Sequence, residues 1–173
     1  MPLHSGEIVD VTITGVHRGT SGSPGELRGS FTGDTTGELL INSQVGIFGT
    51  GGQPDTALEP VPLALRYEVV EGPATILCTL DDKGPQEYSI SIEKVSIAEN
   101  NPTKNMVIRV TDPRLLEKTG GIVQGMSGSP IIQNGRLVGA VTHVLVRDPT
   151  RGFGIFVENM LKTADQVTAG AAA

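Results

Sequence analysis

A short glycine-rich stretch in the second half of the chain carries the residue types best suited to chemistry. Residues 125–130 read Gly-Met-Ser-Gly-Ser-Pro, and two isoleucines follow at once. Glycines on both sides of a serine let the backbone turn sharply, so that the Ser127 hydroxyl can stand clear of its neighbours. The backbone N–H groups of Gly125 and Ser127 can then meet the negative charge that develops on a carbonyl oxygen. The pattern predicts Ser127 as a nucleophile, with Gly125 and Ser127 forming an oxyanion hole.

The same hexapeptide pattern occurs a second time, at residues 19–24, which read Gly-Thr-Ser-Gly-Ser-Pro. The continuation of this copy, residues 25–28, is polar and typical of a turn. Ser127 is instead followed by an apolar strand, a turn at Asn134-Gly135 and a second apolar strand. Because the context of a motif decides its meaning, we favour Ser127 over Ser21, and we expect Ser21 to lie in a mobile loop.

Short apolar segments between glycine- and proline-rich turns indicate a β protein. A helical turn is expected at residues 114–118, and a helix at 158–168 with Met160 and Leu161 on its apolar face. The expected strands are residues 7–16, 27–31, 37–41, 46–49, 63–70, 74–80, 87–97, 106–111, 136–146 and 153–157. This order predicts an all-β fold, an antiparallel barrel or sandwich that ends in a helix.

The bulk composition limits the class of protein. The 173 residues suffice for one domain or for two small barrels. A formal charge of −6 with scattered Lys and Arg argues against a nucleic-acid partner. No apolar run reaches the ~20 residues that span a bilayer, and the single cysteine, Cys78, excludes an intrachain disulfide. No His/Cys cluster has metal-ligand spacing and no phosphate loop is present, so we predict no metal and no cofactor.

Several segments of the chain resemble the stage IV sporulation protein B peptidase family. The resemblance is carried by residues 121–135, which include the serine motif, and by residues 139–144, 148–150, 105–116 and 46–50. It covers nearly the whole chain. The resemblance implies a trypsin-like double β-barrel, with residues 1–60 as the remainder of the first sub-barrel and 61–173 as the second sub-barrel plus the helix. It also implies serine endopeptidase activity on a protein substrate in the signalling cascade of endospore formation.

The resemblance assigns further site residues. Asp112 matches the position proposed for the aspartate of the family's catalytic triad. More generally, the chain from Ser127 onward is similar to the end of trypsin-like proteases. That similarity implies that Thr142 and His143 lie on the strand that pairs with substrate backbone, and Gly152 on the strand that forms the far wall of the primary specificity pocket. Family members act outside the cytoplasm, between the forespore and mother-cell membranes, and usually carry a membrane anchor and a PDZ domain. Neither of these two parts is recognisable in this sequence.

A serine nucleophile needs a base, and the position of that base stays open. The family's histidine lies in a Gly-His segment upstream of the strand at residues 7–16, and the chain is expected to begin after it and to be inactive or nearly so. His4 and His17 do not match that motif. His143 is expected to pack on its strand or to contact substrate, with a role as surrogate base as the alternative. Asp112 is interpreted either as the triad carboxylate or as the start of an Asp-Pro turn.

Other interpretations remain beside these. Asp34 and Glu38 are rival carboxylates to Asp112, because trypsin-like enzymes take theirs from the first barrel. A non-catalytic domain that binds an extended peptide along residues 141–144 is the second function. Exposed strand edges predict a possible homodimer. An α/β hydrolase is disfavoured, because no long helix follows the serine.

Overall fold

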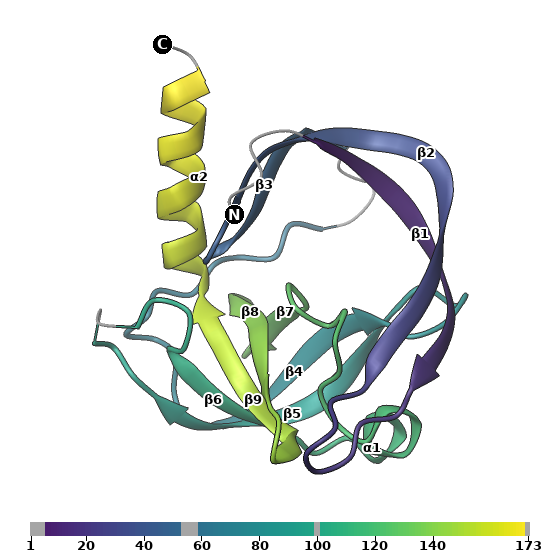
Figure 1. Ribbon diagram of the computed structural model, residues 1–173. Coiled ribbons are helices and arrows are strands. Elements are labelled where there is room, and N and C mark those ends of the chain that lie inside the picture. The colour runs from purple at the N-terminus through teal and green to yellow at the C-terminus, as the bar shows by residue number, and fades with distance from the viewer. Residues whose placement is uncertain (1–5, 53–58, 99–100, 172–173) are drawn as a thin grey trace.

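The computed structural model describes residues 6–52, 59–98 and 101–171. His4, and residues 53–58 just before the predicted boundary between the sub-barrels, lie outside the described residues. Figure 1 shows an arched sheet that stands above a barrel, with one helix rising beside it. The arch is a three-stranded sheet in the order β1 (Gly6–His17), β2 (Glu26–Ser43) and β3 (Gly46–Gly51).

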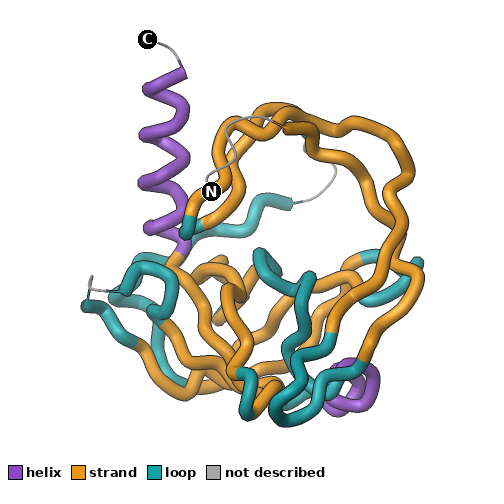
Figure 2. The backbone as a smooth tube through the Cα atoms, in the orientation of Figure 1, coloured by secondary structure: helices purple, strands orange, loops and turns teal. Residues whose placement is uncertain are grey.

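The second unit is a closed six-stranded antiparallel barrel in the order β4-β5-β6-β9-β8-β7. Its strands and the two helices are β4 (Gly72–Thr79), β5 (Pro85–Val95), β6 (Met106–Val110), α1 (Pro113–Thr119), β7 (Pro130–Gln133), β8 (Arg136–Leu145), β9 (Asp148–Phe156) and α2 (Val157–Ala171). The predicted all-β fold with a C-terminal helix is therefore confirmed. Figure 2 shows loops between the barrel strands and the lower end of the arched sheet.

The hydrophobic core lies inside the barrel. Alternate residues of β4 and β5 point inward, so that Ile76, Ile90 and Ile92 are fully buried while their neighbours are not. This is the period of two expected for strands that have one face on a core. The arched sheet lacks such a core, and large apolar side chains such as Val11 and Phe31 are exposed on it.

Two predicted strands, residues 27–31 and 37–41, prove to be parts of a single strand. Residues 27–31 and 37–41 belong to one 18-residue strand, β2, because the intervening glycine-containing residues form a bulge instead of a turn. Gly33 adopts a φ of 89° there, with open space around it, and such bulges let a long strand bend. Figure 1 shows this bend as the arch of β1 and β2.

The predicted strand at residues 63–70 is a loop with a turn. Leu63 forms a single bridge to Leu137. The Glu68 carboxylate then accepts a hydrogen bond from the Leu65 N–H at 2.8 Å, while the Glu68 N–H donates to the Leu65 carbonyl. The buried Gln133 side chain binds the Val70 backbone at both its N–H and its carbonyl. Side chains thus satisfy the backbone groups that a neighbouring strand would otherwise pair.

Gly139 tests whether the closure of the barrel depends on close strand contact. A Cβ at this buried position would collide with the Ile155 carbonyl oxygen of β9. We expect Gly139→Ala to lower the free energy of unfolding by at least about 3 kcal/mol, because β8 and β9 would have to separate. Urea denaturation measures this, with Gly15→Ala in β1 as the control, since nothing lies near its added methyl. Equal stability of the two variants would contradict the expectation.

Candidate active site

Ser127 lies at the apex of a turn whose other residues are tied to the barrel. The Met126 side chain is buried, and the Met126 N–H donates to the Val123 carbonyl at 3.2 Å. The Gly128 N–H donates to the Val141 carbonyl at 2.8 Å, and the Val141 N–H donates to the Ser129 carbonyl at 2.9 Å. Ser127 itself is exposed. The turn therefore presents one hydroxyl to solvent on an otherwise anchored backbone.

The backbone N–H groups on either side of this apex are available to a ligand. Within the described residues, neither the Gly125 N–H nor the Ser127 N–H donates a hydrogen bond. Gly125 has a φ of 96°, a left-handed conformation that favours glycine. Atoms of the Leu27 side chain lie 3.1–3.2 Å from where a Cβ of Gly125 would be. Leu27 of β2 thus packs beside Gly125 at the predicted oxyanion hole.

The Ser127 hydroxyl is bonded to backbone and not to a base. Ser127 Oγ donates to the Thr142 carbonyl oxygen at 2.9 Å. The Thr142 hydroxyl faces elsewhere and donates to the Thr103 and Phe153 carbonyls. Thr142 therefore contacts the predicted nucleophile, Ser127, through its backbone. In the part of the chain that the structure describes, no imidazole hydrogen-bonds to Ser127.

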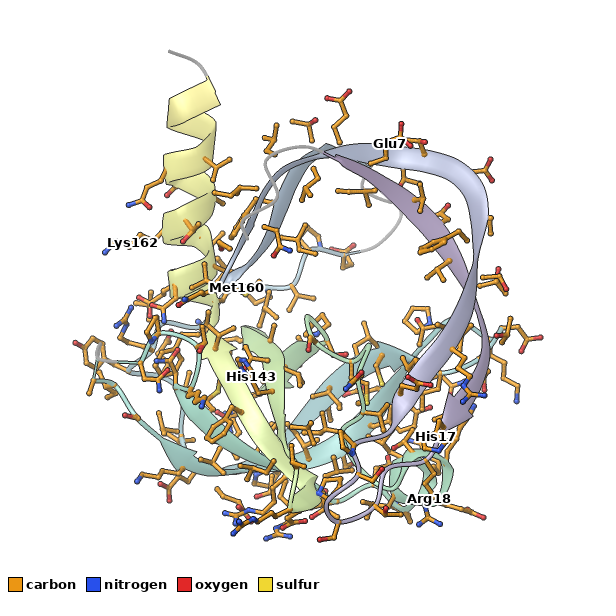
Figure 3. The ribbon with its side chains drawn as sticks, viewed as in Figure 1. Glu7, His17, Arg18, His143, Met160 and Lys162 are labelled. Carbon is orange, nitrogen blue, oxygen red and sulfur yellow. The ribbon has the colours of Figure 1, made fainter. Side chains whose placement is uncertain are left out.

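The two described histidines lie at different ends of the molecule, as Figure 3 shows. His17 ends β1 near α1, and His143 lies on β8 below α2. His143 is exposed and its ring makes no hydrogen bond to a described residue. It does share a pocket with Ser127. His143 is thus close enough to the site to meet a substrate, while His17 is remote from it.

This pocket, of about 420 Å³, lies between the barrel and the arched sheet. The barrel contributes Ser127 and residues 140–143 of β8, and α2 contributes Met160. The full lining is Asn42, Ser43, Gln44, Val45, Gly46, Ile47, Ser127, Gly128, Ala140, Val141, Thr142, His143, Ile155 and Met160. The sequence interpretation missed the wall formed by the turn between β2 and β3, and it missed Met160. Neither Asp34 nor Glu38 lines this pocket.

Asp112 is bound as a helix cap. Its carboxylate accepts from the Arg114 N–H at 2.9 Å and from the Arg114 guanidinium at 2.7 and 3.0 Å, and it accepts from the Ser89 N–H at 3.2 Å. The Arg114 guanidinium lowers the pKa of this buried carboxyl from 3.8 to about 2, and the backbone N–H donors add to the effect. The Asp-Pro turn interpretation describes these contacts, and no hydrogen bond joins Asp112 to Ser127 or to a described histidine.

Gly152 is buried inside the barrel wall beside β8. A Cβ at this position would lie 2.6 Å from Ile122 Cδ1 and 2.5 Å from the His143 carbonyl oxygen. The Ile122 side chain is itself buried. Gly152 is therefore adjacent to the strand that carries Thr142 and His143, but Ile122 covers its face.

A comparison with models of protein families identifies the family of this chain. The family model described as SpoIVB peptidase S55 matches residues 1–161 of the 173. The chain belongs to this family. The resemblance seen in the sequence is thereby confirmed, and membership supports a serine peptidase with a protein substrate. No curated protein sequence matches the chain.

Solved structures support the fold. The Rv3671c protease of M. tuberculosis in its active form is similar with a TM-score of 0.53 and 16% identity, covering 86% of this chain and 65% of that one. The inactive form of a serine-to-alanine mutant of Rv3671c gives a TM-score of 0.52 and 13% identity, covering 89% of this chain and 86% of that one. At such identities the likeness concerns the fold alone, which is trypsin-like. Among the described residues, no helix is long and apolar enough to span a membrane.

The contacts of Asp112 predict a loss of stability when its charge is removed. At pH 7 we expect Asp112→Asn to lower the free energy of unfolding by about 1–2 kcal/mol, because charged hydrogen bonds to Arg114 are lost. The folded pKa of about 2 lies below the ordinary 3.8, so this stabilisation is complete above pH 4 and disappears as the pH falls toward 2. Urea denaturation at pH 7, 4 and 2.5 should show the two proteins converge.

The control for this comparison is Asp82→Asn, which changes an exposed carboxylate in the turn after β4. We expect it to leave stability nearly unchanged at each pH. An Asp112→Asn protein that keeps wild-type stability but loses peptidase activity would instead favour the triad role of Asp112.

Proposed function

We propose that the chain is a serine endopeptidase of the sporulation type, in which Ser127 attacks the carbonyl carbon of a protein substrate. The observation that carries the proposal is the exposed Ser127 hydroxyl beside two backbone N–H groups that have no partner among the described residues. The N–H groups of Gly125 and Ser127 would stabilise the oxyanion of the tetrahedral intermediate. Collapse of that intermediate would expel the amine and leave an acyl-enzyme, which water then hydrolyses.

Substrate would lie along β8 in this proposal. The pairing of β7 with β8 ends at Ala140, so residues 142–145 have β9 on one side and no described strand on the other. A substrate segment can add to that open edge as a further strand. His143 would contact its side chains from the rim of the pocket. Gly152 would act only indirectly, by leaving room for Ile122 behind β8.

The proposal includes low activity, because no described imidazole is hydrogen-bonded to Ser127. A backbone carbonyl is too weak a base to take the Ser127 proton, and Thr142 supplies only that. An imidazole placed in the 420 Å³ pocket would be within reach of the hydroxyl. The family description supports a role in endospore formation, and we propose that this role is exercised outside the cytoplasm, near a membrane.

A second candidate function rests on the same open edge of β8. A domain without catalysis could hold an extended peptide there by backbone hydrogen bonds alone.

The strands at the two edges of the arched sheet, β1 and β3, could pair in a similar way with a second copy of the chain. Native mass spectrometry tests this self-association, and a monomer at micromolar concentration would exclude it.

A fluorophosphonate probe separates the enzyme from the peptide-binding domain. We expect the probe to label Ser127 slowly, and at least about tenfold faster with 100 mM free imidazole, which can occupy the pocket and accept the proton. Peptide mapping measures the site and rate of labelling. Ser21, in the second copy of the hexapeptide, is the internal control and should stay unlabelled. A folded protein that is never labelled at Ser127, but binds extended peptides, would support the second function.

A further inference from the structure

The second copy of the serine motif, residues 19–24, takes no part in the proposed chemistry. It nevertheless lies against the segment that leads to Gly125 and Ser127. It forms a tight loop between β1 and β2 in which Thr20 and Ser23 exchange two backbone hydrogen bonds of 2.9 Å. Both ends of the loop are hydrogen-bonded to residues 119–124 and its tip to the turn between β8 and β9, which argues against the mobile loop expected from the sequence.

We propose that this loop is a clamp that holds the segment of residues 119–125 so that the Gly125 and Ser127 N–H groups stay free, and that Ser21 is a positioning residue in it. The inference rests on the proposed function, since it assigns these N–H groups to the oxyanion hole. We call residues 19–25 the clamp loop and residues 119–125 the oxyanion segment.

The two ends of the clamp loop bind the two ends of the oxyanion segment. The Gly19 N–H donates to the Thr119 carbonyl at 2.9 Å. The Gln124 N–H donates to the Gly25 carbonyl at 2.8 Å, and the Leu27 N–H returns a bond of 2.9 Å to the Gln124 carbonyl. The last two bonds immobilise the residue directly before Gly125. The Leu27 side chain also lies 3.1–3.2 Å from where a Cβ of Gly125 would be, so β2 approaches this glycine through both its backbone and a side chain.

The tip of the clamp loop binds the turn between β8 and β9. Ser21 Oγ donates to the Arg147 carbonyl at 2.8 Å, and the Gly22 N–H donates to the Val146 carbonyl at 2.8 Å. The start of β9, directly after this turn, binds the oxyanion segment, because the Ile122 N–H donates to the Pro149 carbonyl at 2.7 Å. The clamp loop, the oxyanion segment, and the turn together with the start of β9 thus form a closed triangle in which each part is hydrogen-bonded to the other two.

The oxyanion segment needs such external support because of its own composition. Gly120, Gly121 and Gly125 all have positive φ angles, of 75°, 138° and 96°. A segment with three glycines has many accessible backbone conformations when nothing contacts it. Holding it in one conformation costs a large loss of conformational entropy, which hydrogen bonds to the rest of the protein must offset. The clamp loop also lies too close to Gly120 for any side chain there, since a Cβ at Gly120 would collide with the Gly19 carbonyl oxygen.

Ser21→Ala opens one side of the triangle without touching the oxyanion segment. We expect hydrogen exchange at the Gln124 N–H to accelerate roughly threefold to tenfold, as expected for the loss of one hydrogen bond. The ¹H–¹⁵N resonances of Gly125 and Ser127 should shift, and fluorophosphonate labelling in imidazole should slow by a similar factor. Ser21→Thr keeps the hydroxyl and should restore all three measurements.

Ser23→Ala is the matched control, because it makes the same change in the same loop and the Ser23 hydroxyl has no partner among the described residues. It should behave as the wild type. If Ser21→Ala leaves Gln124 exchange and both resonances unchanged, the clamp is wrong, whatever the labelling does. If the resonances and exchange change while neither protein is labelled at Ser127, the clamp stands and the proposed function fails.

Discussion

Two backbone hydrogen bonds between the serine turn and β8 are the constraint on which the candidate site depends. Gly128 donates to Val141 and Val141 donates to Ser129, so the turn is fixed to a strand of a closed barrel. Closure gives each barrel strand two neighbours, and a shift of β8 would therefore break pairing on both sides. The exposed Ser127 side chain is positioned by these bonds, and among the described residues its hydroxyl makes one hydrogen bond, to the Thr142 carbonyl.

The same attachment places the proposed catalytic groups in two parts of the molecule. The proposed nucleophile Ser127, the proposed oxyanion N–H groups and the open edge of β8 all belong to the barrel unit. The place for a base is the pocket toward the arched sheet, whose other wall is the turn between β2 and β3. A hydroxyl that donates to a carbonyl is oriented but not activated. Among the described residues, the Ser127 turn is therefore held in place by the barrel without a hydrogen bond from Ser127 to an imidazole.

The barrel could be predicted from sequence because its strands alternate buried and exposed residues, as in β4, and because Asp112-Pro113 and Gly120 mark the ends of α1. The arched sheet was harder, since Gly33 in a bulge looks like Gly33 in a turn. Residues 63–70 have the apolar content of a strand, but distant side chains such as Gln133 take the backbone bonds. These errors share one cause, which is that the decisive partner lies far away in sequence.

The site shows the same division between local and distant information. The Ser127 turn follows from glycine spacing, and the cap at Asp112 follows from its proline neighbour, whereas the pocket wall at Asn42–Ile47 exists only because β1 and β2 bend back over the barrel. The two hexapeptides make the point most directly. Ser127 lies just before β7, and its hydroxyl is exposed. Ser21 lies in the loop between β1 and β2, and its hydroxyl donates a hydrogen bond to the Arg147 carbonyl. Equal motifs therefore acquire different roles from the strand that follows them.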